Sequence, residues 1–451
     1  MKTRINFKDE FYQKLKLLVL PIAIQNFMLA LVSATDAIML GWIDQTSLSA
    51  VSLAGQVQFV LSLFISGIAA GAGIMAAQYW GKQDAASIEK VIPIALRTNL
   101  LFSGLFTILA GFCPEMLMRI FTNDAALVAS GSQYLRAVAL SYVLCGISQV
   151  YLILLKNTGH AAVSSRISST AVVLNIILNA ILIYGLCGAP ALGIRGAAYA
   201  TVVELIWAYL ETKKPERVRI LWNRLFSSAG KILSEDFWRY TLPVLAASLV
   251  WGIAYVLYSV IMGHMGSDAV AANSITSIAK SLLSCLIRGV SGGAGVLIGN
   301  LLGANELEKA REYGRRLSHL SIAIGIVTGG LLMLISPAIV HFAPLSDTAA
   351  EYLQYMLLFC GLNLMAQSVN TTVLDGIFCA GGDAKFDMQG NIGAMWCFSV
   401  PLGFLAAFWL KLPVMVVYCI VNLDEIVKLP AVYHHYKKYI WVRNITRDVE
   451  D

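Results

Sequence analysis

The sequence predicts an all-α polytopic membrane protein with twelve transmembrane helices in two pseudo-symmetric six-helix lobes. Three observations lead to this fold class: the composition, the length of the apolar runs and a repeat between the two halves. Of the 451 residues, 58% are hydrophobic and 13% are charged, whereas a soluble domain has about 45–50% apolar and about 25% charged residues. A water-soluble core of this length cannot bury such an apolar surplus, so the chain is expected to lie in a bilayer.

Apolar runs long enough to cross about 30 Å of hydrocarbon occur along the whole chain. The predicted spans of the first half are 17–42, 50–78, 91–112, 125–155, 163–187 and 194–212. Those of the second half are 237–263, 271–300, 315–341, 348–379, 390–409 and 413–435. We therefore expect an N-terminal lobe over 1–212, a cytoplasmic linker over 213–236, a C-terminal lobe over 237–435 and a cytoplasmic tail over 436–451.

Basic residues gather on one side of these spans. With both ends of the chain in the cytoplasm, 27 of the 33 Lys and Arg residues fall in or beside the inside segments, and three (Arg119, Arg195 and Lys411) fall outside. Positive residues are retained on the cytoplasmic side of a membrane. We therefore expect a multi-pass protein of the cell inner membrane with both termini cytoplasmic. Because the charge follows the membrane, the net charge of +6 does not indicate nucleic-acid binding.

The two halves repeat Gly and Pro positions at a constant offset of 222 residues. The pairs are Pro21/Pro243, Gly41/Gly263, Gly71/Gly293, Gly73/Gly295 and Gly81/Gly303. Since each half has six spans, both halves enter and leave on the same side, and the duplication is parallel. Two parallel six-span bundles suggest a cleft between them and transport by alternating access. The alternatives are a channel or a membrane-embedded enzyme.

Motifs along the chain resemble one transporter family. The chain contains, in this order, TDAIMLGWID, AQYWGKQD, LLKNTGHA, LNIILNAILIYG, PALGIRGAAYAT and GIFCAGGDAKF. Together these motifs resemble the multidrug and toxic compound extrusion (MATE) transporters over nearly the whole chain. The resemblance implies two six-helix lobes, a central cavity and export of small organic cations driven by inward H⁺ or Na⁺.

A carboxylate inside the first predicted span is the candidate for ion coupling. Asp36 lies about six residues, or roughly 9 Å, from the outer end of that span, and an acid at a span centre costs roughly 2.5–3.5 kcal/mol. Asn175 and Asn179 share one face of the fifth span, and Thr201 lies at a similar depth in the sixth. Carboxylate, amide and hydroxyl oxygens suit Na⁺ or a proton with hydrogen-bonded neighbours. The alternative is an acid that reaches the outer interface.

The resemblance implies a role for the same four residues. In the family, the acid of the first span and polar positions of spans five and six form a cation site in the N-terminal lobe. Some members carry a second acid where this chain has Asn179, so both H⁺ and Na⁺ remain open. The acids of the sodium-coupled branch in spans seven and ten have no counterpart in SLVWGIAY (248–255) or AQSVN (366–370). Beyond a coupling ion at Asp36, no metal or cofactor is expected.

A second set of residues is expected to line the substrate cavity. It comprises Glu204, Lys280, Phe27, Met28, Trp251, Tyr255 and Met365. Aromatic rings and Met side chains can form an adaptable apolar site for flat cations. The alternative for each aromatic or Met residue is contact with lipid or with the core of a lobe.

The charged members of this set leave alternatives open. Glu204 can attract a cationic substrate or pair with Arg136. Lys280 shares a helix face with Arg288. This basic face can repel cations, pair with an acid such as Asp375, or select an anionic or zwitterionic substrate.

Other motifs narrow the function. Asp424 and Glu425 precede Lys428 by four and three residues, which predicts local ion pairs. The chain has no GxxxxGK[ST] and no HExxH motif, so we expect neither ATP-driven transport nor an enzyme. We therefore expect a monomeric exporter that lies in the lipid bilayer. The alternative in the same superfamily is a flippase for lipid-linked or anionic substrates, which needs a larger and more basic cavity.

Overall fold

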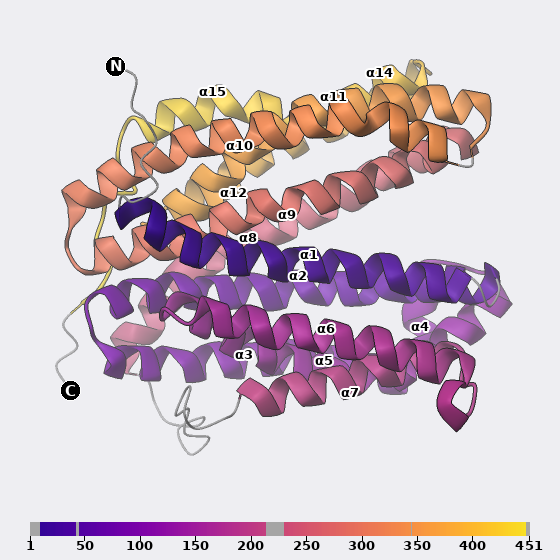
Figure 1. Ribbon diagram of the computed structural model, residues 1–451, viewed down its shortest axis with the longest axis horizontal. Coiled ribbons are helices and arrows are strands. Elements are labelled where there is room, and N and C mark those ends of the chain that lie inside the picture. The colour runs from indigo at the N-terminus through magenta and orange to yellow at the C-terminus, as the bar shows by residue number, and fades with distance from the viewer. Residues whose placement is uncertain (1–9, 42–44, 213–229, 344, 448–451) are drawn as a thin grey trace. The chain divides into compact units, whose positions relative to one another are not determined.

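The computed structural model describes residues 10–41, 45–212, 230–343 and 345–447, without the side chains of 33, 34, 36–38, 40, 41, 45–48 and 212. All regular structure in these residues is helical (Figure 1). The first half forms α1 (Glu10–Gly41), α2 (Gln45–Gly81), α3 (Ala85–Phe112), α4 (Pro114–Arg119), α5 (Ala125–Asn157), α6 (Ala161–Tyr184), η1 (Leu186–Gly188) and α7 (Ile194–Thr212). The second half forms α8 (Lys231–Gly263), α9 (Ser267–Gly303), α10 (Leu307–Phe342), α11 (Asp347–Thr371), η3 (Thr372–Phe378), α12 (Ala384–Asn391), η4 (Ile392–Ser399), α13 (Val400–Phe404), η5 (Leu405–Trp409), α14 (Val414–Val421) and α15 (Asp424–Tyr436).

Among the described residues, ten helical segments are long and apolar enough to cross a bilayer. They coincide with ten of the predicted spans, and α7 occupies the sixth predicted span. The predicted fold class of an all-helical membrane protein is therefore confirmed. The span predicted as continuous over 413–435 is instead divided into α14 and α15. At the break, the Asn422 side chain donates to Tyr418 O at 3.0 Å, a local bond that competes with helix continuation.

Contacts divide the described chain into two compact units. Unit 1 contains the described residues up to Asn26, Ala77–Gln83 and Ala246–Arg447, and unit 2 contains Phe27–Ala76 and the described residues of Asp84–Leu245. Each unit therefore includes a short piece of the other half of the sequence. The lobes over 1–212 and 237–435 stay a prediction, and most of the predicted linker, 213–229, lies outside the described residues.

Each unit has its own apolar core. In unit 2, residues of α2 to α7 pack around Leu61 and Leu135, which are 2% and 0% exposed. In unit 1, the start of α1 packs through Phe11 against α9, α10 and η3. These cores position the polar side chains of each unit between helices that are held together by apolar contacts.

Close contacts of glycines accompany the placement of the start of α1 in unit 1 and the start of α8 in unit 2. In unit 2, Gly67 of α2 lies against Leu245 of α8, and in unit 1, Gly289 of α9 lies against Ala23 of α1. Gly67 and Gly289 correspond to each other at the 222-residue offset, as do Ala23 and Leu245. The next such pair of contacts is Gly71 with Thr241 and Gly293 with Val19. The first helix of each half thus packs on the second helix of the other half, with glycines that allow close approach.

The last turn of α2 crosses the last turn of α9 inside unit 1. The reciprocal contacts are Gly81 with the backbone of Asn300, and Gly303 with the backbone of Gln78. Between them, Ala77 lies against Gly299, its own counterpart at the 222-residue offset. Self-complementary contacts of this kind arise where a two-fold repeat meets itself. Four of the repeated glycines, Gly71, Gly293, Gly81 and Gly303, are therefore sites of helix contact.

We expect Gly303→Ala to lower the free energy of unfolding by about 1–3 kcal/mol, the usual effect of forcing extra volume into a packed interface. The added Cβ would overlap the Gln78 carbonyl group. The matched control is Gly104→Ala in α3, where a Cβ meets nothing within 4 Å and helix propensity favours Ala by about 0.5–1 kcal/mol. Thermal unfolding in detergent measures both, and equal stability of the two variants would contradict the crossing.

Candidate functional site

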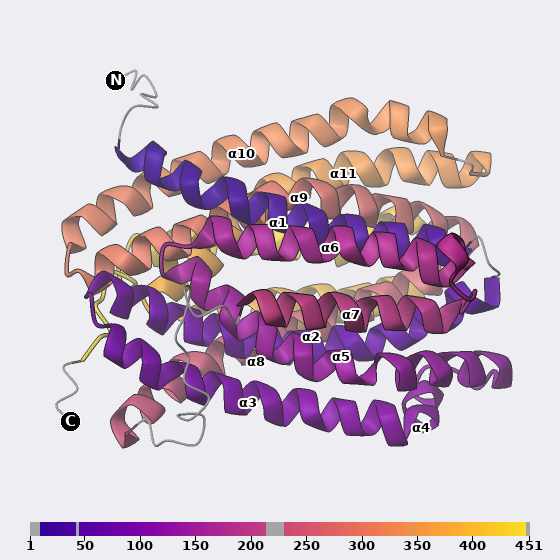
Figure 2. The same cartoon turned by 60° about the horizontal axis from the view of Figure 1, so that its bottom comes forward.

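Three of the four predicted coupling residues hydrogen-bond in series in unit 2. We call Asn175, Asn179 and Thr201 the N-terminal polar chain. Asn179 Nδ2 donates to Asn175 Oδ1 at 2.9 Å, and Asn175 Nδ2 donates to Thr201 Oγ1 at 3.4 Å. Both amides are 1% exposed. Asn175 and Asn179 lie on α6 and Thr201 lies on α7, and these two helices pack side by side (Figure 2). The structure therefore brings together the polar positions that were predicted from depth and spacing.

The fourth residue, Asp36, lies in α1, and its side chain is outside the described residues. The adjacent turn of α1 is positioned by Tyr184 at the end of α6, whose Oη donates to Met39 O at 2.6 Å. Asn179 lies on the same helix as Tyr184. The grouping of Asp36 with the N-terminal polar chain remains a prediction that this bond between α1 and α6 supports.

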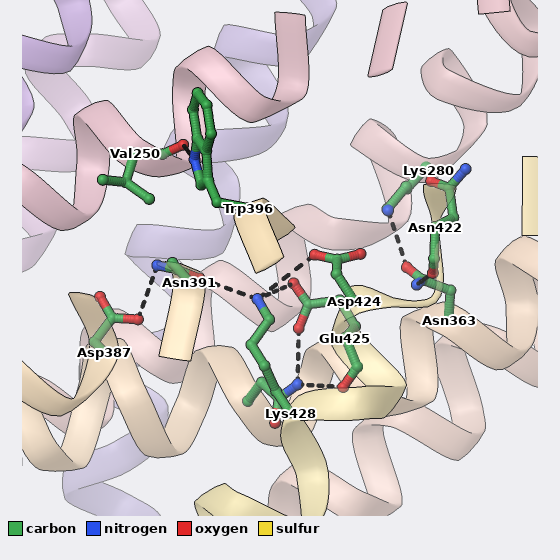
Figure 3. A network of polar contacts seen from close by, with 11 residues as sticks. Val250, Lys280, Asn363, Asp387, Asn391, Trp396, Asn422, Asp424, Glu425 and Lys428 are labelled. Carbon is green, nitrogen blue, oxygen red and sulfur yellow. Dashed lines mark hydrogen bonds and ion pairs between the residues drawn. The ribbon is translucent and has the colours of Figure 1, made fainter. Parts of the chain in front are cut away.

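A second polar centre lies in unit 1 (Figure 3). We call Lys428, Asp424, Glu425, Asn391 and Asp387 the C-terminal charge network. Lys428 Nζ lies 3.6 Å from Asp424 Oδ2 and 3.3 Å from Glu425 Oε1, which confirms the predicted local ion pairs. Its third contact is Asn391 Oδ1 at 3.1 Å, and Asn391 Nδ2 donates to Asp387 Oδ1 at 3.1 Å. The Lys428 side chain is only 5% exposed, so its charge is compensated by these groups and not by bulk water.

The break between α14 and α15 creates this centre. Acidic residues in the first turn of a helix interact favourably with its dipole, and α15 begins with Asp424 and Glu425. Two amides of α11 bind the backbone at the break: Asn363 Nδ2 donates to Asn422 O at 2.6 Å, and Asn370 Nδ2 donates to Glu425 O at 2.6 Å. Irregular backbone at membrane depth is tolerated only when such groups are satisfied. The asparagines therefore make the broken helix possible.

Further charges surround the network. Lys280 is half-buried and donates to Asn363 Oδ1 at 3.0 Å, so the predicted alternative of pairing with Asp375 is replaced by a bond to a neutral amide. Asp375 lies exposed on the π-helical segment η3, within electrostatic range of Asp387 and Arg288. π-helical turns are rare and often mark functional sites. The C-terminal charge network therefore contains three carboxyl groups and one ammonium group.

No group of three or more His, Cys, Asp or Glu residues that could hold a metal ion occurs among the described residues. The predicted Na⁺ site depends on the Asp36 side chain, which lies outside the described residues. The described part of unit 2 offers amide and hydroxyl oxygens, which are hard ligands, but the carboxylate is the ligand on which Na⁺ binding would depend.

The predicted cavity residues are divided between the units. Unit 2 contains Phe27, Met28 and Glu204, and unit 1 contains Trp251, Tyr255, Lys280 and Met365. The rings of Trp251 and Tyr255 stack with centroids 5.5 Å apart, and Tyr255 is 43% exposed. Phe27 is 45% exposed, while Met28 and Met365 are half-buried. An exposed aromatic pair can receive a flat cation, and the cavity role of these residues remains a prediction.

Glu204 is half-buried on α7. Arg136, the partner considered for it, forms its ion pair with Glu115 Oε1 at 3.7 Å. Of the two alternatives for Glu204, pairing with Arg136 is therefore not what the structure shows, because the guanidinium lies on an exposed surface beside α4. The substrate role of Glu204 stays a prediction.

The sequence analysis missed three asparagines that organise the C-terminal charge network. Asn363, Asn370 and Asn391 are at most 7% exposed. The available signal was their position inside or beside apolar runs, with Asn363 and Asn370 seven residues apart on one helix face. Spacing alone does not reveal that both amides bind a helix break more than fifty residues later in the chain.

Comparisons with known proteins agree over the full length. The MatE family model matches residues 21–181 and 243–405. The probable multidrug resistance protein YoeA of Bacillus subtilis (strain 168) is 21% identical over 99% of this chain and 98% of its own. The solved structure of an outward-facing multidrug resistance MATE family transporter of the MOP superfamily has a TM-score of 0.82 at 18% identity, covering 98% of this chain and 99% of that one. A MOP superfamily transporter from Pyrococcus furiosus Vc1, described by the reverse polarity of its binding pocket, has a TM-score of 0.86 at 18% identity, covering 98% and 99%.

We expect Lys428→Met to lower the free energy of unfolding by about 3–5 kcal/mol, because it leaves buried carboxylates without their cation. The matched control is Lys385→Met on α12, where the side chain is exposed and the effect should stay within about 0.5 kcal/mol. Thermal unfolding in detergent provides the measurement.

The double variant Lys428→Met/Glu425→Gln should recover part of the lost stability, because it removes one of the uncompensated charges. If Lys428→Met is as stable as Lys385→Met, the ammonium group does not balance the network.

Proposed function

Because the chain belongs to the MatE family, we propose that this multi-pass membrane protein is a secondary transporter that exports amphipathic organic cations in exchange for H⁺ or Na⁺. One observation carries the coupling assignment: two amides, each 1% exposed, and a hydroxyl form a hydrogen-bonded chain between α6 and α7. Buried polar groups are costly in a membrane and often mark ion pathways. We therefore assign the coupling site to Asp36, Asn175, Asn179 and Thr201.

The chemistry of coupling follows from desolvation. A carboxylate in low dielectric favours a bound proton or cation, and amide groups nearby can donate to the charged form or accept from the protonated one. Occupation from outside neutralises Asp36 and changes which helix arrangement is favoured. A membrane potential adds about 2.3 kcal/mol per charge per 100 mV to this cycle.

Helix α1 provides a route from this site to the rest of the protein. It belongs to unit 2 from Phe27 onward and to unit 1 up to Asn26. A change in the packing of α1 around Asp36 therefore acts on a helix that both units contain. The same holds for α8, which is divided between Leu245 and Ala246.

The substrate assignment rests on the relatives and on the aromatic residues. YoeA is named a probable multidrug resistance protein, and the stacked, partly exposed Trp251 and Tyr255 offer faces for a flat cation. We further propose that Glu204, Lys280, Phe27, Met28 and Met365 line the cavity. The excess of basic residues on one side supports a cell-membrane location with both termini cytoplasmic, and we propose that the protein acts as a monomer.

A second candidate function is export or flipping of lipid-linked or anionic compounds. The observation that favours it is Lys280, which donates to the neutral Asn363 and has no ion pair among the described residues. A half-buried ammonium group with no carboxylate of the described residues at ion-pair distance can bind a phosphate or carboxylate of a substrate. The Pyrococcus transporter with reversed pocket polarity has the same fold, so that fold does not restrict the charge of the substrate.

We expect Asp36→Asn to reduce gradient-driven efflux by about tenfold or more, because the amide binds neither a proton nor Na⁺ with comparable affinity. Expression and unfolding temperature should be unchanged. The matched control is Asp124→Asn at the start of α5: Asp124 caps Ala126 N and Leu127 N, and Asn caps equally well. Normal efflux by Asp36→Asn would reject the coupling assignment.

We expect proteoliposomes to export an ethidium-like dye when either a pH gradient or a sodium gradient is imposed separately, and the gradient that works identifies the coupling ion. If expressing cells retain the dye as control cells do, while a lipid-linked precursor crosses the membrane, the flippase is the correct function. Lys280→Gln should then lower transport of the lipid-linked substrate.

A further inference from the structure

The segment after α15 folds back over helix ends of unit 1 (Figure 1, yellow). We call Trp441–Arg447 the strap. Trp441 is 0% exposed; its ring lies against Gly314 of α10, and its carbonyl group lies against Gly381 in the turn before α12. Arg443 Nη2 donates to Gly381 O at 3.3 Å. The beginning of the strap is thus embedded in the second half of the chain.

The strap also binds the last turn of α2, which comes from the first half. Gln78 is 0% exposed, and its Oε1 accepts a hydrogen bond from Ile445 N at 2.8 Å. Its Nε2 donates to Ala380 O at 2.7 Å and to Arg443 O at 3.3 Å. One turn later, Lys82 Nζ donates to an oxygen of the strap. A single buried glutamine therefore links α2 to the strap and to the turn at Ala380.

The place of this contact is the α2–α9 crossing. Asn444 Nδ2 of the strap donates to Gly303 O at 3.4 Å, and Gly303 lies directly against the Gln78 backbone. The strap therefore holds both helix ends at the point where they cross. It has to leave one of them if the crossing opens.

The two attachments differ in kind. Trp441 is held by apolar contacts in a core that includes Phe378 and Tyr313, and exposing such a ring is costly. The α2 side is held by hydrogen bonds between the strap and Gln78, Tyr79 and Lys82, and hydrogen bonds with water can replace them at a small net cost. Release is therefore expected at α2, with Trp441 remaining in its core.

We propose that Gln78 and the strap form a latch that holds the α2–α9 crossing closed and releases α2 once in each transport cycle. The latch rests on the proposed function, because alternating access requires helix ends on one face to separate and reclose. It is independent of which ion or substrate is used. Gln78 is a positioning residue, because its hydrogen bonds to the strap and to Ala380 set the place of the last turn of α2.

Reversible cross-linking tests the requirement for release. In Lys82→Cys/Arg447→Cys, a short bis-methanethiosulfonate reagent joins α2 to the strap, since Lys82 Nζ lies 2.8 Å from Arg447 O. Each cysteine thiol displaces methanesulfinate from the reagent and forms a disulfide that can later be reduced. We expect dye export in proteoliposomes to fall about tenfold or more and to return on reduction. The single variants Lys82→Cys and Arg447→Cys, treated alike, control for reaction at the native cysteines. Full export by the cross-linked double variant would overturn the latch.

A second measurement is independent of transport, so it separates failure of the latch from failure of the proposed function. Gln78→Leu should raise amide hydrogen exchange about tenfold or more in 77–83, while exchange around Tyr313 in α10 stays unchanged. The matched control is Gln56→Leu, earlier on α2. Equal exchange in the two variants, or a uniform rise along the chain, would overturn the latch even if dye export is normal.

Discussion

Hydrocarbon offers no hydrogen-bond partner to a buried polar group, and this constraint organises the structure of this protein. Lys428 is placed among oxygen atoms of neighbouring helices, and the broken backbone at Asn422 is bound by Asn363. In the other unit, Asn175 and Asn179 bind one another. These polar groups bind one another inside the protein, so the helices that carry them can present apolar outer surfaces.

The same solvent leaves packing as the main force between helices. Glycines recur at the places where helices from the two halves meet, as in the contacts of Gly67 with Leu245 and of Gly289 with Ala23. The first part of α1 lies in unit 1 and the first part of α8 lies in unit 2, so each unit contains a segment of the other half of the sequence.

The two polar centres differ in how firmly they are built. The N-terminal polar chain is short and linked in series, and it is the place proposed for an ion bound at Asp36. The C-terminal charge network is larger: Lys428 is bound on three sides, and its removal would expose the carboxylates of unit 1 to each other. We regard the first as suited to coupling, and the second as suited to maintaining a broken helix.

The sequence by itself determined the helical membrane fold, most of its spans and the shared face of Asn175 and Asn179, because run length and helical spacing depend on bonds within one helix. Only the tertiary structure decided the break at Asn422, the asparagines that bind it and the burial of Trp441 under Gly314. Those features join segments that are far apart along the chain. They depend on the shapes of packed helices, which no local pattern specifies.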